Sequence, residues 1–297
     1  MLSAQEFDEL YIKSWTKTSL IRIDDVFFKC EHENPTGSIK SRGLSLQVEG
    51  LLKKGYRKAV ISSSGNAALA AAYYCNKAQI ELIAFVPMTI DPHKLKLMQS
   101  YGAFVTKTQQ AIEDAEREAR MSNTPLIRQS ADPVAPLGFS GLADELVAQL
   151  NEQKIAPKDV SIFFPVSSGT TLAGWYRRMR DTYKQEMIPQ VHAVQTAAVR
   201  TIVEQYDPSV KRKARSIVPG IVARDEENTY KAEVLEAIDK TGGSGWVVTD
   251  EAVQQAKSWL QTHGIDSSLE GALALAGYWR AKEHSYEMRG SIVVVLT

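Results

Sequence analysis

Short apolar runs of strand length alternate with longer amphipathic segments along almost the whole chain of 297 residues. The run at 58–61 precedes an alanine-rich helical segment that starts near Ala67, and the run at 160–164 precedes a helix near Leu172. Strands that alternate with helices in this way are typical of βαβ units, whose strands lie parallel beneath their helices. The sequence therefore predicts an α/β fold with mainly parallel sheets, and its length predicts two lobes.

Composition excludes several functional classes. The 35 basic residues balance 35 acidic ones, so we expect no net charge that would attract nucleic acid or an anionic membrane. Cys30 and Cys75 are too few for a disulfide framework, and no histidine and cysteine group has metal-ligand spacing. The sequence also lacks a signal-peptide core and any apolar run of membrane-spanning length. We expect a cytoplasmic protein without a metal.

One lysine stands at the start of a predicted helix. Ser38 is a typical N-cap residue, and an apolar stripe follows over 39–52 before Gly55. Lys40 therefore falls in the first helical turn, where the helix dipole disfavours a positive charge and lowers the pKa of an amine. An amine that must be neutral to attack a carbonyl gains from this position. Taken alone, the pattern also fits an ordinary solvated lysine beside a helix cap.

Two strand–loop–helix junctions, at 62–66 and 167–171, are rich in serine, threonine and glycine. Such junctions collect free backbone N–H groups at the positive end of a helix, which suits them to bind anions. Each alone also fits an ordinary turn in which a hydroxyl caps the helix. Neither has the lysine of a Walker loop or the glycines of a dinucleotide fold. Together with Lys40 they supply an amine, a phosphate site and a carboxylate site, which a pyridoxal phosphate enzyme acting on an amino acid requires.

These motifs resemble those of the fold type II pyridoxal-phosphate enzymes, the tryptophan synthase β family. The segment 34–40, NPTGSIK, resembles the Schiff-base lysine motif, and 63–66, SSGN, resembles the S-x-G-N loop. The segment 165–174, PVSSGTTLAG, resembles the phosphate loop, and 293–297, VVVLT, resembles the terminal strand that ends in L-T-G. The resemblance extends over essentially the whole chain, with the motifs in the same order.

The resemblance implies a role for each motif residue. Lys40 would carry pyridoxal 5'-phosphate and act as the catalytic base, and Asn66 would hydrogen-bond the phenolic oxygen of the cofactor. Thr297 would face the pyridine nitrogen, where a neutral hydroxyl favours elimination and replacement over transamination. The residues implied to bind the phosphate are Ser167, Ser168, Gly169, Thr170 and Thr171. The residues implied to bind the substrate carboxylate are Ser63, Ser64, Gly65 and Ala67.

The same resemblance implies an architecture. It consists of two three-layer α/β/α lobes with mainly parallel sheets. Residues 1–39 and 134–297 would form a large cofactor-binding domain, and 40–133 a small mobile domain that carries the SSGN loop. Relatives of this kind also imply a homodimer that acts on a small amino-acid substrate.

Within the family, the motifs look most like threonine synthase, a lyase that converts O-phosphohomoserine to threonine. The alternatives are a serine or threonine dehydratase and a cysteine synthase-like enzyme, which act by β-elimination or β-replacement. An alternative of another class is a non-catalytic homologue that acts as a binding module. A phosphate-sugar or nucleotide-binding protein without the cofactor is a third possibility, against which the SSGN loop argues.

Five residues depart from the family pattern. Ser41 replaces an aspartate after the lysine, and Ser167 and Thr170 replace two glycines of the phosphate loop, which predicts a reshaped loop. Ala135 and Ser140 stand where threonine synthases carry an arginine and a lysine near the phosphorylated substrate. The sequence therefore leaves the substrate open, and these departures are the reason for considering a non-catalytic homologue.

Overall fold

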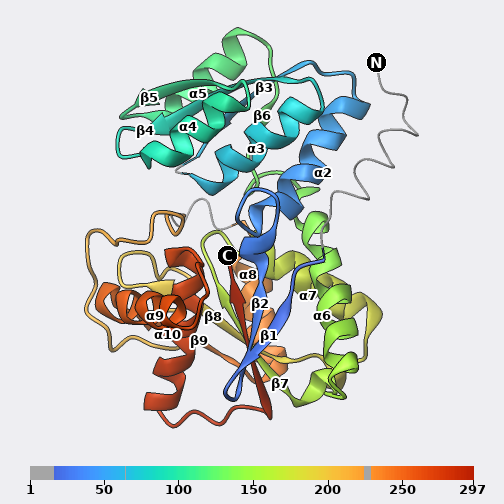
Figure 1. Ribbon diagram of the computed structural model, residues 1–297, viewed down its shortest axis with the longest axis vertical. Coiled ribbons are helices and arrows are strands. Elements are labelled where there is room, and N and C mark those ends of the chain that lie inside the picture. The colour runs from blue at the N-terminus through green and yellow to red at the C-terminus, as the bar shows by residue number, and fades with distance from the viewer. Residues whose placement is uncertain (1–16, 64, 224–228) are drawn as a thin grey trace. The chain divides into compact units, whose positions relative to one another are not determined.

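The computed structural model describes residues 17–63, 65–223 and 229–297, and these form two compact units (Figure 1). The small unit is Glu33–Gly138, and the large unit is Lys17–His32 together with Phe139–Thr297. The sequence-based boundaries, 40 and 133, differ from these by a few residues. The reason is local: a β-carbon on Gly138 would lie 2.5 Å from the carbonyl oxygen of Arg42, so the 134–138 segment packs directly on the helix that begins at Lys40.

The large unit is built on one six-stranded sheet with the order β1-β2-β10-β7-β8-β9. The strands, in sheet order, are Leu20–Ile23, Val26–Cys30, Ser291–Leu296, Val160–Pro165, Gln190–Thr196 and Ser244–Val248. All neighbouring strands run parallel except β1, which pairs with β2 as an antiparallel hairpin. The carboxyl ends of the parallel strands therefore meet at one edge of the sheet, where ligands bind in open α/β folds.

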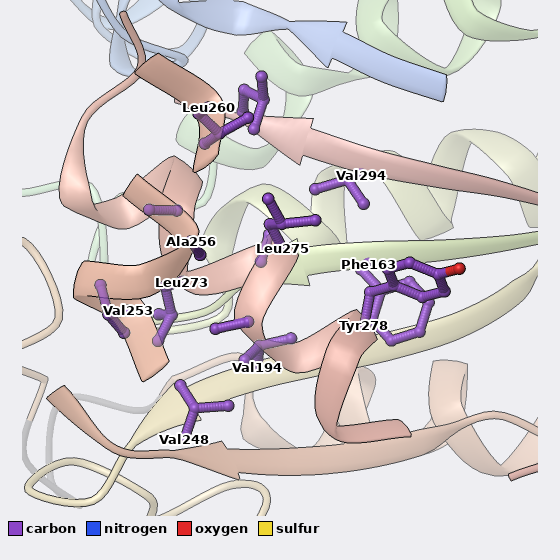
Figure 2. Packing of buried hydrophobic residues seen from close by; sticks show 14 of the residues in the cluster. Phe163, Val194, Val248, Val253, Ala256, Leu260, Leu273, Leu275, Tyr278 and Val294 are labelled. Atoms are coloured by element: carbon purple, nitrogen blue, oxygen red, sulfur yellow. The ribbon is translucent and has the colours of Figure 1, made fainter. Parts of the chain in front are cut away.

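Helices cover both faces of this sheet. They are α6 (Ser140–Glu152), α7 (Thr170–Thr182), α8 (Lys231–Thr241), α9 (Asp250–Thr262) and α10 (Leu269–Glu283). On one face, Phe163 of β7 belongs to the apolar core beneath α9 and α10, and its ring lies 5.6 Å from that of Tyr278 (Figure 2). The next residue, Phe164, points to the opposite face, where its ring lies 5.3 Å from that of Trp175 of α7. Because successive strand residues point to opposite faces, the sheet is the middle of three layers.

The small unit is built on a four-stranded parallel sheet with the order β5-β4-β3-β6. The strands are Phe104–Thr108, Glu81–Pro87, Lys58–Ser62 and Leu126–Ile127 in sheet order, and the helices are α2 (Lys40–Lys53), α3 (Asn66–Lys77), α4 (Pro92–Ser100) and α5 (Ala111–Met121). Ala59 and Ile61 of β3 pack into the core formed with α2, α3 and α4, whereas Val60 between them is buried on the other face. The helix α5 packs on β3 and β4.

The α/β fold with mainly parallel sheets is confirmed. Four elements were not predicted from the sequence: the hairpin strands β1 and β2, the short strand β6 and the helix α8. Short 3-10 helices complete the chain at Glu31–Glu33 (η1), Ala135–Phe139 (η2), Pro157–Asp159 (η3) and Gln185–Met187 (η4). No helix in the described ranges is both long and apolar enough to cross a bilayer. The same ranges hold no cluster of side chains that could bind a metal ion.

Candidate active site

Lys40 is the first residue of α2 and is half-buried. A tight turn precedes Lys40, in which the Gly37 N–H donates a hydrogen bond to the Asn34 carbonyl at 2.8 Å. Gly37 has a φ of 72°, a conformation that glycine adopts more readily than other residues. The Ser38 hydroxyl accepts a hydrogen bond from the Lys40 N–H at 3.3 Å. Ile39, rather than Ser38, is the residue that immediately precedes the helix, so the predicted cap is displaced by one position.

Ser41, which replaces the aspartate expected after the lysine, is buried in a neutral hydrogen-bonded group. Its hydroxyl lies 2.6 Å from that of Thr36, and it also hydrogen-bonds the buried Tyr74 of α3. Burial raises the pKa of Tyr74 to about 12. A carboxylate here would lose its hydration, and neither Thr36 nor Tyr74 carries a positive charge to compensate for that loss. Serine therefore matches the two neutral hydroxyl groups that it contacts.

The loop predicted to bind a carboxylate connects β3 to α3 in the small unit. The Ser63 hydroxyl accepts a hydrogen bond from the Gly65 N–H at 3.2 Å, and Asn66 and Ala67 form the first turn of α3. Among the described residues no side chain caps this helix, so its first-turn N–H groups suit the binding of an anion. Ser64 lies outside the described residues. The helix that carries Lys40 packs along α3, so the small unit supplies both the lysine and this loop.

Lys94, a residue that sequence reasoning missed, contacts the same loop. Its Nζ donates a hydrogen bond to Oδ1 of Asn66 at 2.6 Å. Lys94 lies in the first turn of α4, where a lysine is electrostatically disfavoured in the same way as Lys40. That helix position was the sequence signal that could have identified it.

The predicted phosphate loop follows β7 in the large unit. Gly169 has a φ of 89° and a left-handed conformation, and α7 begins at the next residue, two residues earlier than predicted. No side chain in the described ranges caps this helix, and the hydroxyl oxygens of Ser168 and Thr170 lie 2.9 Å apart. The loop therefore presents hydroxyl groups and uncapped backbone N–H groups, which are the donors that a phosphate needs.

Ser167 has a different role from the glycine expected in its place. Its Oγ accepts hydrogen bonds from the N–H groups of Val222 and Ala223, each at 3.2 Å. A hydroxyl has two lone pairs and one hydrogen, so these two bonds leave only its hydrogen for a further partner. Ser167 is thus oriented as a donor, and its hydroxyl anchors the 219–223 segment to the loop that was predicted to bind phosphate.

Thr297 directly follows β10, which lies beside β7 in the sheet. The two strands pair in parallel, with Val294 opposite Phe163, so Thr297 and the predicted phosphate loop follow neighbouring strands at the same edge of the sheet. The Thr297 carbonyl oxygen accepts a hydrogen bond from the Ser268 N–H at 3.1 Å, at the start of α10. A β-carbon on Gly271 would lie 2.8 Å from the Thr297 nitrogen, so only glycine lets α10 approach this closely.

Glu270 was also missed in the sequence. It lies in the first turn of α10, is 6% exposed, and accepts a hydrogen bond from the Gly220 N–H at 2.6 Å. The 219–223 segment is therefore tied to Ser167 at one end and to α10, next to Thr297, at the other. An acidic residue in a first helical turn is so common that it carries no functional signal by itself.

The chain is similar to known proteins in both sequence and structure. A family model described as "Pyridoxal-phosphate dependent enzyme" matches residues 12–297. Threonine synthase from Methanocaldococcus jannaschii is 27% identical over 292 residues, which cover 93% of this chain and 70% of the relative. L-serine dehydratase from Saccharomyces cerevisiae is 28% identical over 268 residues, covering 80% of this chain and 78% of the relative. The solved structure of a T.th. threonine deaminase has a TM-score of 0.79 at 22% identity, over 99% of this chain and 97% of that one.

The family match covers nearly the whole chain, and the structural likeness shows the fold type II architecture. The motifs that first suggested a cofactor lie within the matched range. The chain therefore belongs to the family of pyridoxal-phosphate dependent enzymes, and pyridoxal phosphate is its cofactor.

Proposed function

We propose that this chain is a lyase that catalyses elimination or replacement on a small amino acid, similar to threonine synthase, with Lys40 as the cofactor-bound residue. One observation carries the proposal. β7 and β10 are neighbouring parallel strands, so the loop predicted to bind phosphate and Thr297 follow adjacent carboxyl ends of the sheet. A neutral partner for the pyridine nitrogen favours elimination and replacement over transamination.

The residues present fit the cofactor. At Gly169 a β-carbon would lie 2.8 Å from Cγ2 of Val234, so only glycine fits between that side chain and the loop. Around it, Ser167 is oriented to donate, and Ser168 and Thr170 add hydroxyl groups. When bound, pyridoxal phosphate supplies an electron sink for the α-carbon of an amino acid.

The proposal gives each chain residue a task. The Lys40 amine accepts the α-proton as general base. The loop with Ser63, Gly65 and Ala67 binds the substrate carboxylate through its hydroxyl and N–H groups. The Asn66 carboxamide donates a hydrogen bond to the phenolic oxygen of the cofactor. The leaving group then departs from the β- or γ-carbon. In a replacement, water or another nucleophile adds and the Lys40 ammonium returns its proton to the α-carbon, whereas in an elimination the product is released as a keto acid.

A second candidate is a serine or threonine dehydratase. Ala135 is fully buried in η2 and carries no charge, and the other altered position, Ser140, starts α6 with a neutral side chain. Neither supplies the positive charge that the phosphate of O-phosphohomoserine would need. This observation favours a substrate without a phosphate group, such as serine or threonine.

Replacement of Lys40 by alanine tests the assignment. We expect the variant to lose the visible absorbance band of the lysine-bound cofactor and all turnover, because alanine has no amine to join the carbonyl. Replacement of the exposed Lys54 by alanine is the matched control and should leave the spectrum unchanged. A band that persists without Lys40 would contradict the proposal. Titration of the wild type with O-phosphohomoserine, serine, threonine and O-acetylserine then identifies the substrate by the spectral change that it causes.

Replacement of Gly169 by alanine should weaken cofactor binding by about tenfold or more, because the β-carbon contacts Val234 and the left-handed backbone becomes strained. The dissociation constant follows from titration of cofactor-depleted protein with pyridoxal phosphate. Gly264 has a similar φ of 75° but no neighbour within 4 Å, so its replacement by alanine controls for backbone strain alone. Equal affinities for the two variants would show that the loop does not hold the phosphate.

A further inference from the structure

Lys94 lies in the first turn of α4, where the helix dipole disfavours a positive charge. The Asp91 carboxylate caps α4 by accepting hydrogen bonds from the N–H groups of His93 and Lys94, at 2.8 and 3.0 Å. The ammonium group thus stands at the positive end of the helix dipole, where a cation destabilises the helix. Its Nζ lies 3.6 Å from the position that a β-carbon on Gly65 would take. The side chain therefore reaches back onto the loop between β3 and α3.

Asn66 is the partner of this ammonium group. Lys94 Nζ donates to Asn66 Oδ1 at 2.6 Å, and no carboxylate in the described part of the chain forms an ion pair with Lys94. Lys58 in the same unit behaves differently, since its Nζ lies 2.8 Å from a carboxylate oxygen of Glu81. The Lys94 ammonium group therefore makes its hydrogen bond to the Asn66 carboxamide, and the Asp91 carboxylate attracts it only from a greater distance.

This contact determines which way the carboxamide faces. A lysine ammonium has hydrogens to donate and no lone pair, so the atom that faces it must be the amide oxygen. The NH₂ group of Asn66 then points away from Lys94, and it has no hydrogen-bond partner among the described residues. A flipped amide would lose the charge-assisted bond and set two donor groups against each other.

We propose that Lys94 is a positioning residue, which fixes the Asn66 carboxamide with its NH₂ group directed at the phenolic oxygen of the cofactor. The inference rests on the proposed function, because the bound cofactor supplies the acceptor for that NH₂ group. Lys94 acts through Asn66 alone. Its charge also polarises the amide, which strengthens the N–H groups as donors.

The experiment compares holoenzymes of the wild type and of Lys94→Met, Lys94→Arg, Asn66→Ala and the double variant Lys94→Met/Asn66→Ala. We expect Lys94→Met to weaken pyridoxal phosphate binding by about tenfold and to shift the visible absorbance maximum in the same direction as Asn66→Ala. Lys94→Arg keeps a donor and should restore most of the affinity. The double variant should bind no more weakly than Asn66→Ala alone, because Lys94 has no effect without its partner.

Lys96→Met is the matched control, because Lys96 is exposed on the same helix and should leave affinity and spectrum unchanged. Lys94→Gln provides a second neutral variant should the methionine variant fold poorly. The inference fails if Lys94→Met leaves affinity and spectrum unchanged, or if its effect adds fully to that of Asn66→Ala. In either case the proposed function still stands if the visible absorbance band of the cofactor is present in the wild type and lost in Lys40→Ala. A wild type without any band would overturn both.

Discussion

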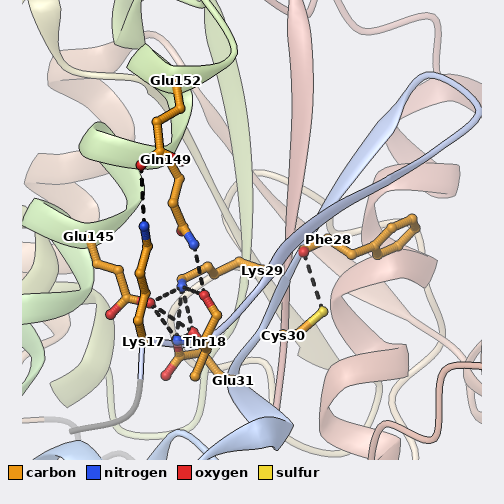
Figure 3. A network of polar contacts seen from close by, with 9 residues as sticks. All are labelled: Lys17, Thr18, Phe28, Lys29, Cys30, Glu31, Glu145, Gln149 and Glu152. Carbon is orange, nitrogen blue, oxygen red and sulfur yellow. Dashed lines mark hydrogen bonds and ion pairs between the residues drawn. The ribbon is translucent and has the colours of Figure 1, made fainter.

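Replacement of Lys29 by methionine is expected to lower the free energy of unfolding of the large unit by about 3–5 kcal/mol. The Lys29 side chain is wholly buried at the end of β2, as is that of Glu31. Its ammonium donates to the Thr18 carbonyl at 2.8 Å, to the Thr18 hydroxyl and to Glu145 (Figure 3). Without the lysine, two carboxylates lose their cation in a dry environment, and the hydrogen bonds to Thr18 are left unmade.

Lys17 gives a matched control next to this cluster in the chain. Its ion pair with Glu152 spans 3.3 Å, but the two side chains are 58% and 61% exposed. Lys17→Met should therefore cost at most about 0.5 kcal/mol. Urea unfolding followed by tryptophan fluorescence is a suitable measurement, because Trp175, Trp246, Trp259 and Trp279 all belong to the large unit. Equal midpoints for the two variants would show that the buried charge is not a structural requirement.

The sequence predicted the fold well wherever its signals were local. The alanine-rich run from Ala67 was correctly assigned to a helix, and the apolar run at 160–164 was correctly assigned to a strand. In both cases the pattern of apolar residues in the sequence matches the element that forms. The hairpin strand β2 was missed because a buried lysine, Lys29, interrupts its apolar run, and the partner that neutralises it, Glu145, lies 116 positions away.

The same distinction between local and distant signals holds for the candidate site. Lys40 and the two loops stand out because each combines a strand end with a helix start, which is a local pattern. Glu270 and Lys94 matter because of Gly220 and Asn66, which lie 50 and 28 positions away in the chain. Such pairs are formed by the tertiary fold, and no spacing rule identifies them. Ser167 illustrates the point further, since its change from the expected glycine is explained by N–H groups at Val222 and Ala223.

The large unit is also expected to lose stability as the pH falls below about 6.5, because of one buried histidine. His192 of β8 is fully buried, and burial lowers its pKa to about 3. Its Nδ1 accepts hydrogen bonds from the backbone N–H of Ser244 and the indole N–H of Trp246, each at 3.2 Å. Its Nε2 lies 3.2 Å from Oε1 of Gln190. The ring is therefore neutral, with its proton on Nε2 facing Gln190.

The sign of the effect follows from proton binding. An exposed histidine in the unfolded chain titrates near its ordinary value of 6.5, so between that value and about 3 the unfolded chain binds one more proton than the folded chain. The free energy of unfolding therefore falls as the pH falls through this window, by about 2 kcal/mol between pH 7 and pH 5. Above the unfolded-state value the group has no effect on the pH dependence.

Urea unfolding at a series of pH values between 5 and 8 measures this slope, and His192→Asn should flatten it because asparagine does not titrate. His263 is exposed, so His263→Asn is the matched control and should keep the wild-type slope. Because the comparison concerns slopes, a constant loss of stability in either variant does not affect it. If His192→Asn keeps the full slope, the buried ring is not its source, and the folded state must accommodate the proton on His192 at a pH well above 3.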